Sequence, residues 1–177
     1  MSDPIITVSE CDVIAIPSGH LAFIPKDSEV ILTQALGDSF SVEYEGNLYR
    51  VAGKHAAAIG LSPPISVAEL IAQGGDIEEM AWRLLKICYD PEIPVDIVNL
   101  GLIYGCNILD SADNLCPYAI HVVMTLTSPT CGMGPILLED IKEKLQQIPK
   151  VKTVTVELVF DPAWSQNHMS DAAKLQL

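Results

Sequence analysis

The first sixty residues carry short runs of apolar and β-branched residues, which polar or glycine-containing turns separate. This punctuation is typical of antiparallel strands, because each turn reverses the chain after a few residues. The runs predicted as strands are residues 11–16, 21–24, 29–36, 39–44 and 48–51. We therefore expect residues 1–62 to form a small β-rich N-terminal domain, folded as an antiparallel sheet or barrel.

The spacing of apolar positions becomes helical after the proline-containing segment 61–64, which is the predicted linker. Ser66 and Glu69, and then Asp76 and Glu79, have the spacing of a capping box, so each pair predicts the start of a helix. The second of these helices has one apolar face, formed by Ile77, Met80, Ala81, Leu84, Leu85 and Cys88.

The rest of the chain alternates between strand and helix. The predicted elements are a hairpin of residues 101–109 and 118–127, a helix at 136–147, a strand at 152–160 and a short helix from Ser170. From residue 76 the main order is therefore α-β-β-α-β. This order predicts the α+β class, with a two-layer domain at residues 66–177.

The net charge of the chain argues against some classes of binding partner. The formal net charge is −13 over 177 residues, whereas phosphate binding needs clustered Lys and Arg. No apolar run reaches transmembrane length, and the first ten residues contain no basic segment of the kind that begins a signal peptide. We expect a cytoplasmic protein with no nucleic-acid partner and no membrane partner.

The cysteines are odd in number, widely spaced and without a CxxC pair. They are Cys11, Cys88, Cys106, Cys116 and Cys131. Such a pattern excludes a disulfide framework and a structural zinc site. Any thiol chemistry must therefore use an isolated cysteine, or cysteines that another chain supplies.

Cys131 is the cysteine best placed for chemistry, because it lies in a glycine-containing loop between a predicted strand and a predicted helix. Gly132 and Gly134 indicate close backbone approach or special dihedral angles, and free N–H groups at the start of a helix favour a thiolate. Such a thiolate could attack an electrophile, bind a soft metal or bridge to another thiol. The alternative is a small, inert residue packed under a turn.

Other residues could support Cys131. Asp90 and Glu92 lie in a proline-rich loop that could aim an acid at the thiol, or they could be solvated carboxylates that end a helix. Thr127 could donate a hydrogen bond to whatever the thiol binds, or it could simply fill its strand. His168 is the histidine that we would test as a base for the thiol.

Residues 76–177 resemble the iron–sulfur cluster assembly family that includes SufT and PaaD-like proteins, which share a MIP18-like domain. The resemblance is carried by residues 89–95, 99–104, 124–135, 161–164 and 169–175. The β-rich segment resembles the N-terminal extension of the SufT branch, through residues 32–37 and 46–51. Together these segments extend over nearly the whole chain.

The resemblance implies a cytosolic accessory factor for the maturation of iron–sulfur proteins, rather than an enzyme. It also implies that the motif cysteine, Cys131, is the reactive residue and that the acidic loop of Asp90 and Glu92 is the other signature. The first hypothesis is therefore an assembly or transfer factor in which Cys131 is a transient ligand of iron or of a cluster. No tightly bound cofactor is expected, and the expected partners are assembly scaffold or carrier proteins and apo-client proteins.

Two other hypotheses stay open: a metal-free adaptor that docks apo-clients onto a scaffold, and a thiol enzyme with Cys131 as nucleophile. A cluster usually takes four ligands, so one motif thiol per chain is too few. A three-stranded sheet also leaves edges that need a partner. We therefore expect a homodimer that forms through the C-terminal domain. In the alternative, the tail and the N-terminal sheet cover those edges within a monomer.

Overall fold

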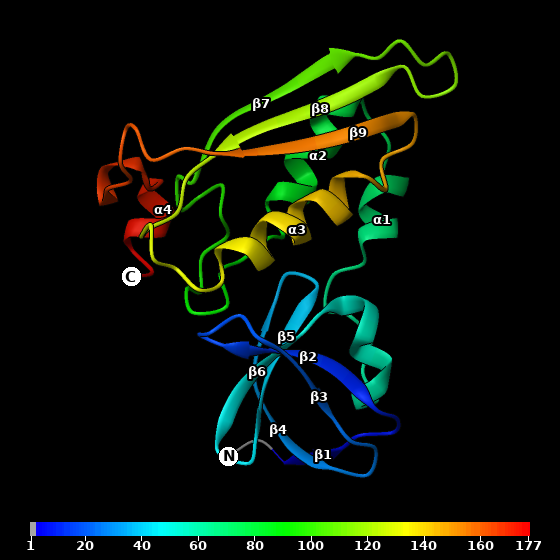
Figure 1. Ribbon diagram of the computed structural model, residues 1–177, viewed down its shortest axis with the longest axis vertical. Helices are drawn as coiled ribbons and strands as arrows, with labels where there is room; N and C mark the ends of the chain where they lie inside the picture. Colours follow the sequence, from blue (N-terminus) through cyan, green and yellow to red (C-terminus); the bar gives the residue numbers. More distant parts are fainter. Residues whose placement is uncertain (1–2) are drawn as a thin grey trace.

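The computed structural model describes residues 3–177, and the chain forms two regions that lie one above the other in Figure 1. The N-terminal region, residues 3–61, contains six strands and a 3-10 helix within the described part. The C-terminal region, residues 66–177, contains the second sheet and the α-helices. Residues 62–65, which belong to no helix or strand, connect the two regions.

The N-terminal sheet is antiparallel, with the strand order β1-β4-β5-β6-β2-β3. Its strands are β1 (Pro4–Ile6), β2 (Cys11–Ile16), β3 (Leu21–Ile24), β4 (Glu29–Leu36), β5 (Ser39–Tyr44) and β6 (Asn47–Val51). Five of these were predicted, and only β6 begins one residue earlier than expected. The sequence analysis missed β1, which is three residues long, and the 3-10 helix η1 (Gly53–Ile59).

The C-terminal region has the predicted order of helices and strands. Its elements are α1 (Val67–Ala72), α2 (Ile77–Leu85), β7 (Ile103–Asp110), β8 (Tyr118–Met124), α3 (Gly134–Leu145), β9 (Val151–Leu158), the 3-10 helix η2 (Gln166–His168) and α4 (Asp171–Lys174). Strand β8 lies between β7 and β9, antiparallel to the first and parallel to the second. Helices α2 and α3 lie between this sheet and the N-terminal region (Figure 1).

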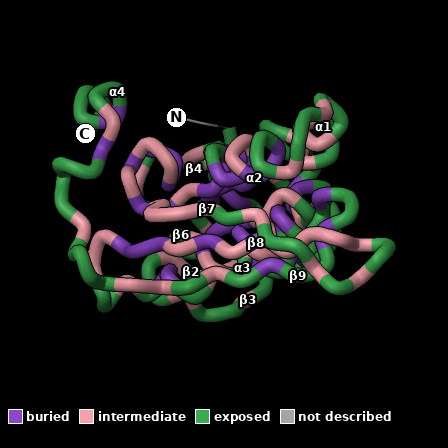
Figure 2. Tube along the Cα trace, turned by 90° about the horizontal axis from the view of Figure 1, so that it is seen from above, coloured by how far each residue is buried: buried purple, intermediate pink, exposed green. Residues whose placement is uncertain are grey.

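Each region has its own hydrophobic core. In the C-terminal region, α2 and α3 pack on the inner face of the sheet, so that Leu84, Ile141 and Val122 are almost fully buried. In the N-terminal region, Val42 and Ile59 belong to a separate buried cluster. Figure 2 shows buried chain in the middle of the molecule and exposed chain around α4.

The helix starts follow the predicted capping pattern. Asp76 accepts a hydrogen bond from the Glu79 N–H, and Glu79 accepts one from the Asp76 N–H, which completes a capping box. Ser66 accepts from the Glu69 N–H and caps α1. Helix α2 therefore starts at a fixed residue, which sets where the acidic loop follows it.

Within residues 3–177, none of the helices combines the length and the apolar composition that crossing a bilayer requires.

The two regions meet through a cluster of buried charges. Arg50 of β6 lies 3.1 Å from the Asp140 carboxylate of α3, and Lys144 of α3 contacts both Asp140, at 2.6 Å, and Asp38, at 3.1 Å. Only 3% of the Lys144 side chain and 7% of the Arg50 side chain are exposed. Buried charges of this kind are costly unless they are paired, so the cluster fixes how the regions fit together.

Candidate functional site

Cys131 lies in the loop that connects β8 to α3, as the sequence predicted. The Cys131 N–H donates to the carbonyl oxygen of Ser128, and its own carbonyl oxygen accepts from the Gly134 N–H, both at 3.2 Å. The side chain is only partly buried. The loop therefore has a fixed backbone and leaves part of the thiol accessible.

The acidic loop follows α2 and is closed by its own hydrogen bonds. The buried Asp90 side chain accepts from the Glu92 N–H at 3.0 Å, and the Asp90 carbonyl oxygen accepts from the Ile93 N–H at 2.9 Å. Tyr89 pairs with Asp96 across the base of the loop. These bonds hold the second carboxylate oxygen of Asp90 in one direction, whereas the Glu92 side chain is exposed.

The two loops bring Cys131 and Asp90 together. The Cys131 thiol donates a hydrogen bond to the Asp90 carboxylate, with 3.6 Å between Sγ and Oδ2. Of the two interpretations offered for Asp90, the structure therefore supports the carboxylate that is aimed at the thiol. Sequence patterns could not show this contact, because the residues are 41 positions apart.

The other predicted site residues have different surroundings. Thr127 is partly buried, and Gly132 is exposed. Gly134 is buried, and a Cβ at that position would lie 2.7 Å from Leu126 Cδ1, so the Leu126 side chain would have to move to admit one. Close backbone approach or special dihedral angles were predicted at both glycines; a backbone atom, the Pro17 carbonyl oxygen, is close at Gly132, whereas a side chain is close at Gly134.

The charge state of Cys131 is where the sequence prediction is wrong. Partial burial raises the pKa of the Cys131 thiol, and the negative charges of Asp90 and Glu92 raise it further. The Met133 N–H lowers it, as expected for the start of a helix, but does not offset the other effects. The thiol therefore carries its proton at neutral pH, in contrast to the predicted thiolate.

The remaining thiols have no comparable surroundings. Cys88 is buried in the core and donates to the Leu84 carbonyl oxygen, and burial raises its pKa. Burial raises the pKa of Cys106 to about 11. His168, which we considered as a base, contacts Ser165 through Nδ1 and lies against the Tyr104 ring. The hydrogen-bond partner of Cys131 is thus a carboxylate and not this imidazole.

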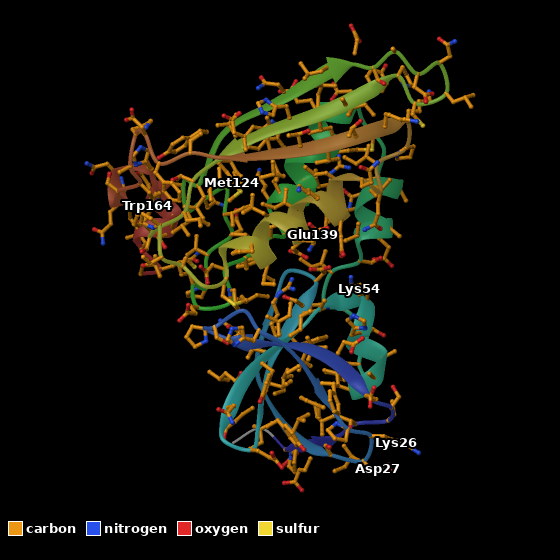
Figure 3. The ribbon with its side chains drawn as sticks, in the orientation of Figure 1. Lys26, Asp27, Lys54, Met124, Glu139 and Trp164 are labelled. Carbon is orange, nitrogen blue, oxygen red and sulfur yellow. The ribbon has the colours of Figure 1, made fainter. Side chains whose placement is uncertain are left out.

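The C-terminal tail packs beside the site region through residues 162 and 164. Trp164, labelled in Figure 3, donates from its indole nitrogen to the Leu100 carbonyl oxygen at 2.8 Å. Tyr104 donates from its hydroxyl to the Pro162 carbonyl oxygen at 2.8 Å. The tail therefore anchors the segment that connects the acidic loop to β7.

Thr125 directly follows Met124, the last residue of β8, and is not among the predicted site residues. Its side chain is fully buried, and among the described residues its hydroxyl has no hydrogen-bond partner. A buried hydroxyl without a partner costs about 1–3 kcal/mol, but a threonine at the end of a strand gives no sequence signal of it.

The described part of this chain offers few side-chain donor atoms for a metal ion at the candidate site. Among residues 3–177, no group of three or more His, Cys, Asp or Glu side chains is arranged to hold a metal ion. The site offers one thiol and one neighbouring carboxylate. Sulfur suits iron and its clusters, and a carboxylate can accept the proton that the thiol must lose.

Comparisons with known proteins agree on the C-terminal region. Residues 78–158 match the family described as iron-sulfur cluster assembly protein. A Porphyromonas gingivalis protein named Fe-S protein maturation auxiliary factor is 40% identical over 100 residues, covering 56% of this chain and 90% of that relative. The Staphylococcus aureus Fe-S protein maturation auxiliary factor SufT is 42% identical over 88 residues, covering 50% of this chain and 93% of the relative.

A solved structure of a domain of unknown function, DUF59, from Bacillus anthracis is 36% identical. It covers 56% of this chain and 90% of its own, with a TM-score of 0.48. The two relatives match about half of this chain, but the match extends over 90% and 93% of their own sequences. The chain belongs to the family of iron–sulfur cluster assembly proteins.

Proposed function

We propose that this protein is an accessory factor for the assembly of iron–sulfur clusters or their transfer to client proteins. Family membership and the names of the relatives support the process. The contact between Cys131 and Asp90 carries the mechanism, in which Cys131 is a transient ligand of iron or of a cluster. The relatives are named auxiliary factors, which fits an assembly factor better than an enzyme.

The ligand exchange at Cys131 conserves charge without any redox step. When iron approaches, the S–H bond of Cys131 breaks and an S–Fe bond forms, while the proton moves to the Asp90 carboxylate and then to water. Asp90 is within hydrogen-bonding distance of Sγ and is therefore the nearest acceptor for that proton. Because binding must displace a proton from a thiol of raised pKa, the ligation is easily reversed, which suits a carrier.

The missing ligands must come from other molecules. A cluster usually takes four protein ligands, and the described part of this site provides one thiol beside one carboxylate. Thiols of the scaffold, of the carrier or of the apo-client would complete the set during transfer, and a second copy of the chain is another source. We therefore propose these proteins as partners, with no cluster bound tightly by one chain.

Anaerobic reconstitution with ferrous iron and sulfide tests Cys131 as the ligand. The wild-type protein should show thiolate-to-iron absorption bands that disappear in Cys131→Ala. Cys116→Ala is the matched control, because Cys116 is also partly exposed but lies in the hairpin turn between β7 and β8. Bands of equal strength in both variants would reject Cys131 as a ligand.

The metal-free adaptor is the second candidate, and the protonated thiol favours it because a neutral thiol binds iron poorly. An adaptor would keep its affinity for an apo-client in Cys131→Ala, and it would lose that affinity when surface residues are changed. Client binding that falls with Cys131→Ala would instead support the ligand role.

A homodimer would place two sites in one assembly. Within the described residues, β7 and β9 each pair on one side only, so both outer edges of this sheet lack a strand partner. The tail packs against residues 99–104 and forms no ladder with either edge. Sedimentation equilibrium over a wide concentration range should show a dimer, and a constant monomer mass would exclude it.

A further inference from the structure

Two turns of the N-terminal sheet reach the two loops of the candidate site. The turn between β2 and β3, at residues 17–20, lies against Gly132, which directly follows Cys131. The turn between β4 and β5, at Gly37 and Asp38, lies against Ile87, three residues before Asp90. The N-terminal region, which contains none of the candidate site residues, therefore contacts both segments that bring the thiol and the carboxylate together.

The contact at the Cys131 loop is made by backbone atoms on both sides. A Cβ atom on Gly19 would overlap the carbonyl oxygen of Gly132, and a Cβ on Gly132 would lie 2.5 Å from the carbonyl oxygen of Pro17. Carbon and oxygen atoms in ordinary contact are about 3.3 Å apart or more. Neither glycine can therefore gain a side chain unless the two backbones separate.

The contact at the acidic loop is similar. A Cβ on Gly37 would overlap the carbonyl oxygen of Ile87, which lies just after α2. Gly37 has φ of +59°, so it supplies both the left-handed backbone and the space that this turn requires. Asp38 in the same turn pairs with Lys144 of α3 and joins the turn to the helix that follows Cys131.

Charge pairs and a shared cavity extend these contacts along the interface. The ion pair of Arg50 with Asp140 holds α3 against β6, and α3 begins three residues after Cys131. A cavity of about 370 Å³ is lined by Pro17 and Gln34 from the N-terminal region and by Pro91 and Glu92 from the acidic loop. Lys54 and Glu139, which are labelled in Figure 3, come from the two regions and both line a second cavity.

We propose that the N-terminal region braces the site, with Gly19 and Gly37 as positioning residues for the pair of Cys131 and Asp90. The β2–β3 turn limits movement of the Cys131 loop, and the β4–β5 turn limits movement of the chain entering the acidic loop. Neither glycine touches the thiol. The importance of the brace for iron transfer rests on the proposed function, but the brace itself can be measured without metal.

The test compares two glycines with nearly the same positive φ in the full-length protein. Gly19 has φ of +75° and faces Gly132, whereas Gly46 has φ of +77° and no atom within 4 Å of the position that a Cβ would take. Gly19→Ala and Gly46→Ala therefore both place a side chain on a backbone of positive φ, but only the first forces the turn away from the Cys131 loop. Any difference between them measures the contact.

Two readouts report the loop. Iodoacetamide labelling of Cys131 is measured relative to Cys116 in the same molecule, and amide hydrogen exchange is followed in a peptide that includes residues 128–134. In Gly19→Ala both rates should rise about threefold or more at the Cys131 loop, since both follow the population of opened loop. In Gly46→Ala they should match the wild type. Equal rates in the two variants would overturn the brace.

Further variants keep the test decisive if Gly19→Ala does not fold. Gly132→Ala probes the same contact from the other side without backbone strain, because its φ lies outside the left-handed region. It should also speed exchange in the β2–β3 turn, and unchanged exchange there would contradict the proposal. Gly37→Ala should speed amide hydrogen exchange at residues 86–92 more than in the Cys131 loop.

The outcome is separable from that of the proposed function. Faster labelling in Gly19→Ala, together with wild-type reconstitution that gives no Cys131-dependent bands, would support the brace and reject the ligand role. Unchanged labelling, with bands that depend on Cys131, would reject the brace alone.

Discussion

The two regions of the molecule have separate hydrophobic cores but use their polar residues differently. In the C-terminal region, Asp90 and Asp96 accept hydrogen bonds from nearby backbone N–H groups and so shape their own loop. In the N-terminal region, Arg50 and Asp38 point out of the sheet and pair with charges on α3. One region therefore contains the candidate site, and the other contacts the loops that form it.

The contrast extends to the kind of contact. Within each region the elements are held by buried apolar side chains, whereas the contacts described between regions are ion pairs and backbone surfaces. The stabilisation that comes from burying apolar side chains does not depend on their exact orientation, whereas ion pairs and close backbone contacts require one geometry. The contacts between the regions therefore fix the orientation of one region relative to the other.

Removal of the N-terminal region should have the largest effect on the candidate site. A fragment of residues 66–177 keeps the whole C-terminal core, so it should still melt cooperatively, at a lower temperature than the full chain. Its Cys131 should label faster than in the full chain. Calorimetry and limiting iodoacetamide labelling check the two points. A fragment with no cooperative transition would show that the N-terminal sheet completes the core, and the predicted division at residues 62 to 66 would be wrong.

Breaking the ionic cluster should cost more than any surface ion pair. Asp140→Asn leaves Arg50 and Lys144 buried without their shared carboxylate, and such a loss typically destabilises a protein by about 3–5 kcal/mol. Glu143→Gln removes the exposed pair with Lys54 and should cost about 1 kcal/mol or less. Urea denaturation of both variants measures the difference, and equal losses would mean that the cluster does not hold the regions.

Acid should weaken the same interface. Burial alone would raise the pKa of Asp140, but Arg50 and Lys144 reverse that effect and hold the pKa below its ordinary value. Its contribution to stability is therefore present above the ordinary carboxyl pKa of about 4 and is lost as pH falls through the lower folded value. The pKa of Lys144 is raised by the carboxylates despite burial, so its contribution is lost only at alkaline pH.

The wild type and Asp140→Asn are the pair that tests this pH dependence. The gap between their free energies of unfolding should be largest near neutral pH and should close as the pH falls well below 4. Denaturation curves at a series of pH values measure it. A gap that stays constant down to pH about 2 would show that Asp140 is not ionised in the cluster.

The smallest expected effect concerns the thiol itself. Asp90→Asn removes a negative charge that raises the pKa of Cys131, so the thiolate fraction at neutral pH should increase and alkylation should become several-fold faster. Glu92→Gln is the control, because Glu92 is exposed and its effect is the smaller of the two. The pH profile of Cys131 alkylation should move to lower pH in Asp90→Asn. A profile that does not move would mean that the carboxylate is not beside the thiol in solution.

Local patterns predicted most of the fold. Strands β2 to β5 were placed at their observed bounds because each lies between turns that contain glycine or charged residues, and α2 was placed by its apolar face and the Asp76 cap. The pKa of Cys131 was predicted in the wrong direction, because the helix start is a local feature whereas the burial and the Asp90 charge come from distant residues. The contact of Gly19 with Gly132 could not be predicted, since a contact between two backbones leaves no side-chain pattern to recognise.

The backbone contact at Gly132 also bears on how this sequence can change over time. A side chain at Gly132 would collide with the Pro17 carbonyl oxygen of the N-terminal region. A side chain at Gly19 would collide with the Gly132 carbonyl oxygen of the C-terminal region. The two positions are therefore coupled in any lineage that keeps both regions. In a relative that consists of the C-terminal region alone, this obstacle is missing, so the contact with Pro17 no longer excludes a side chain on the glycine after the motif cysteine.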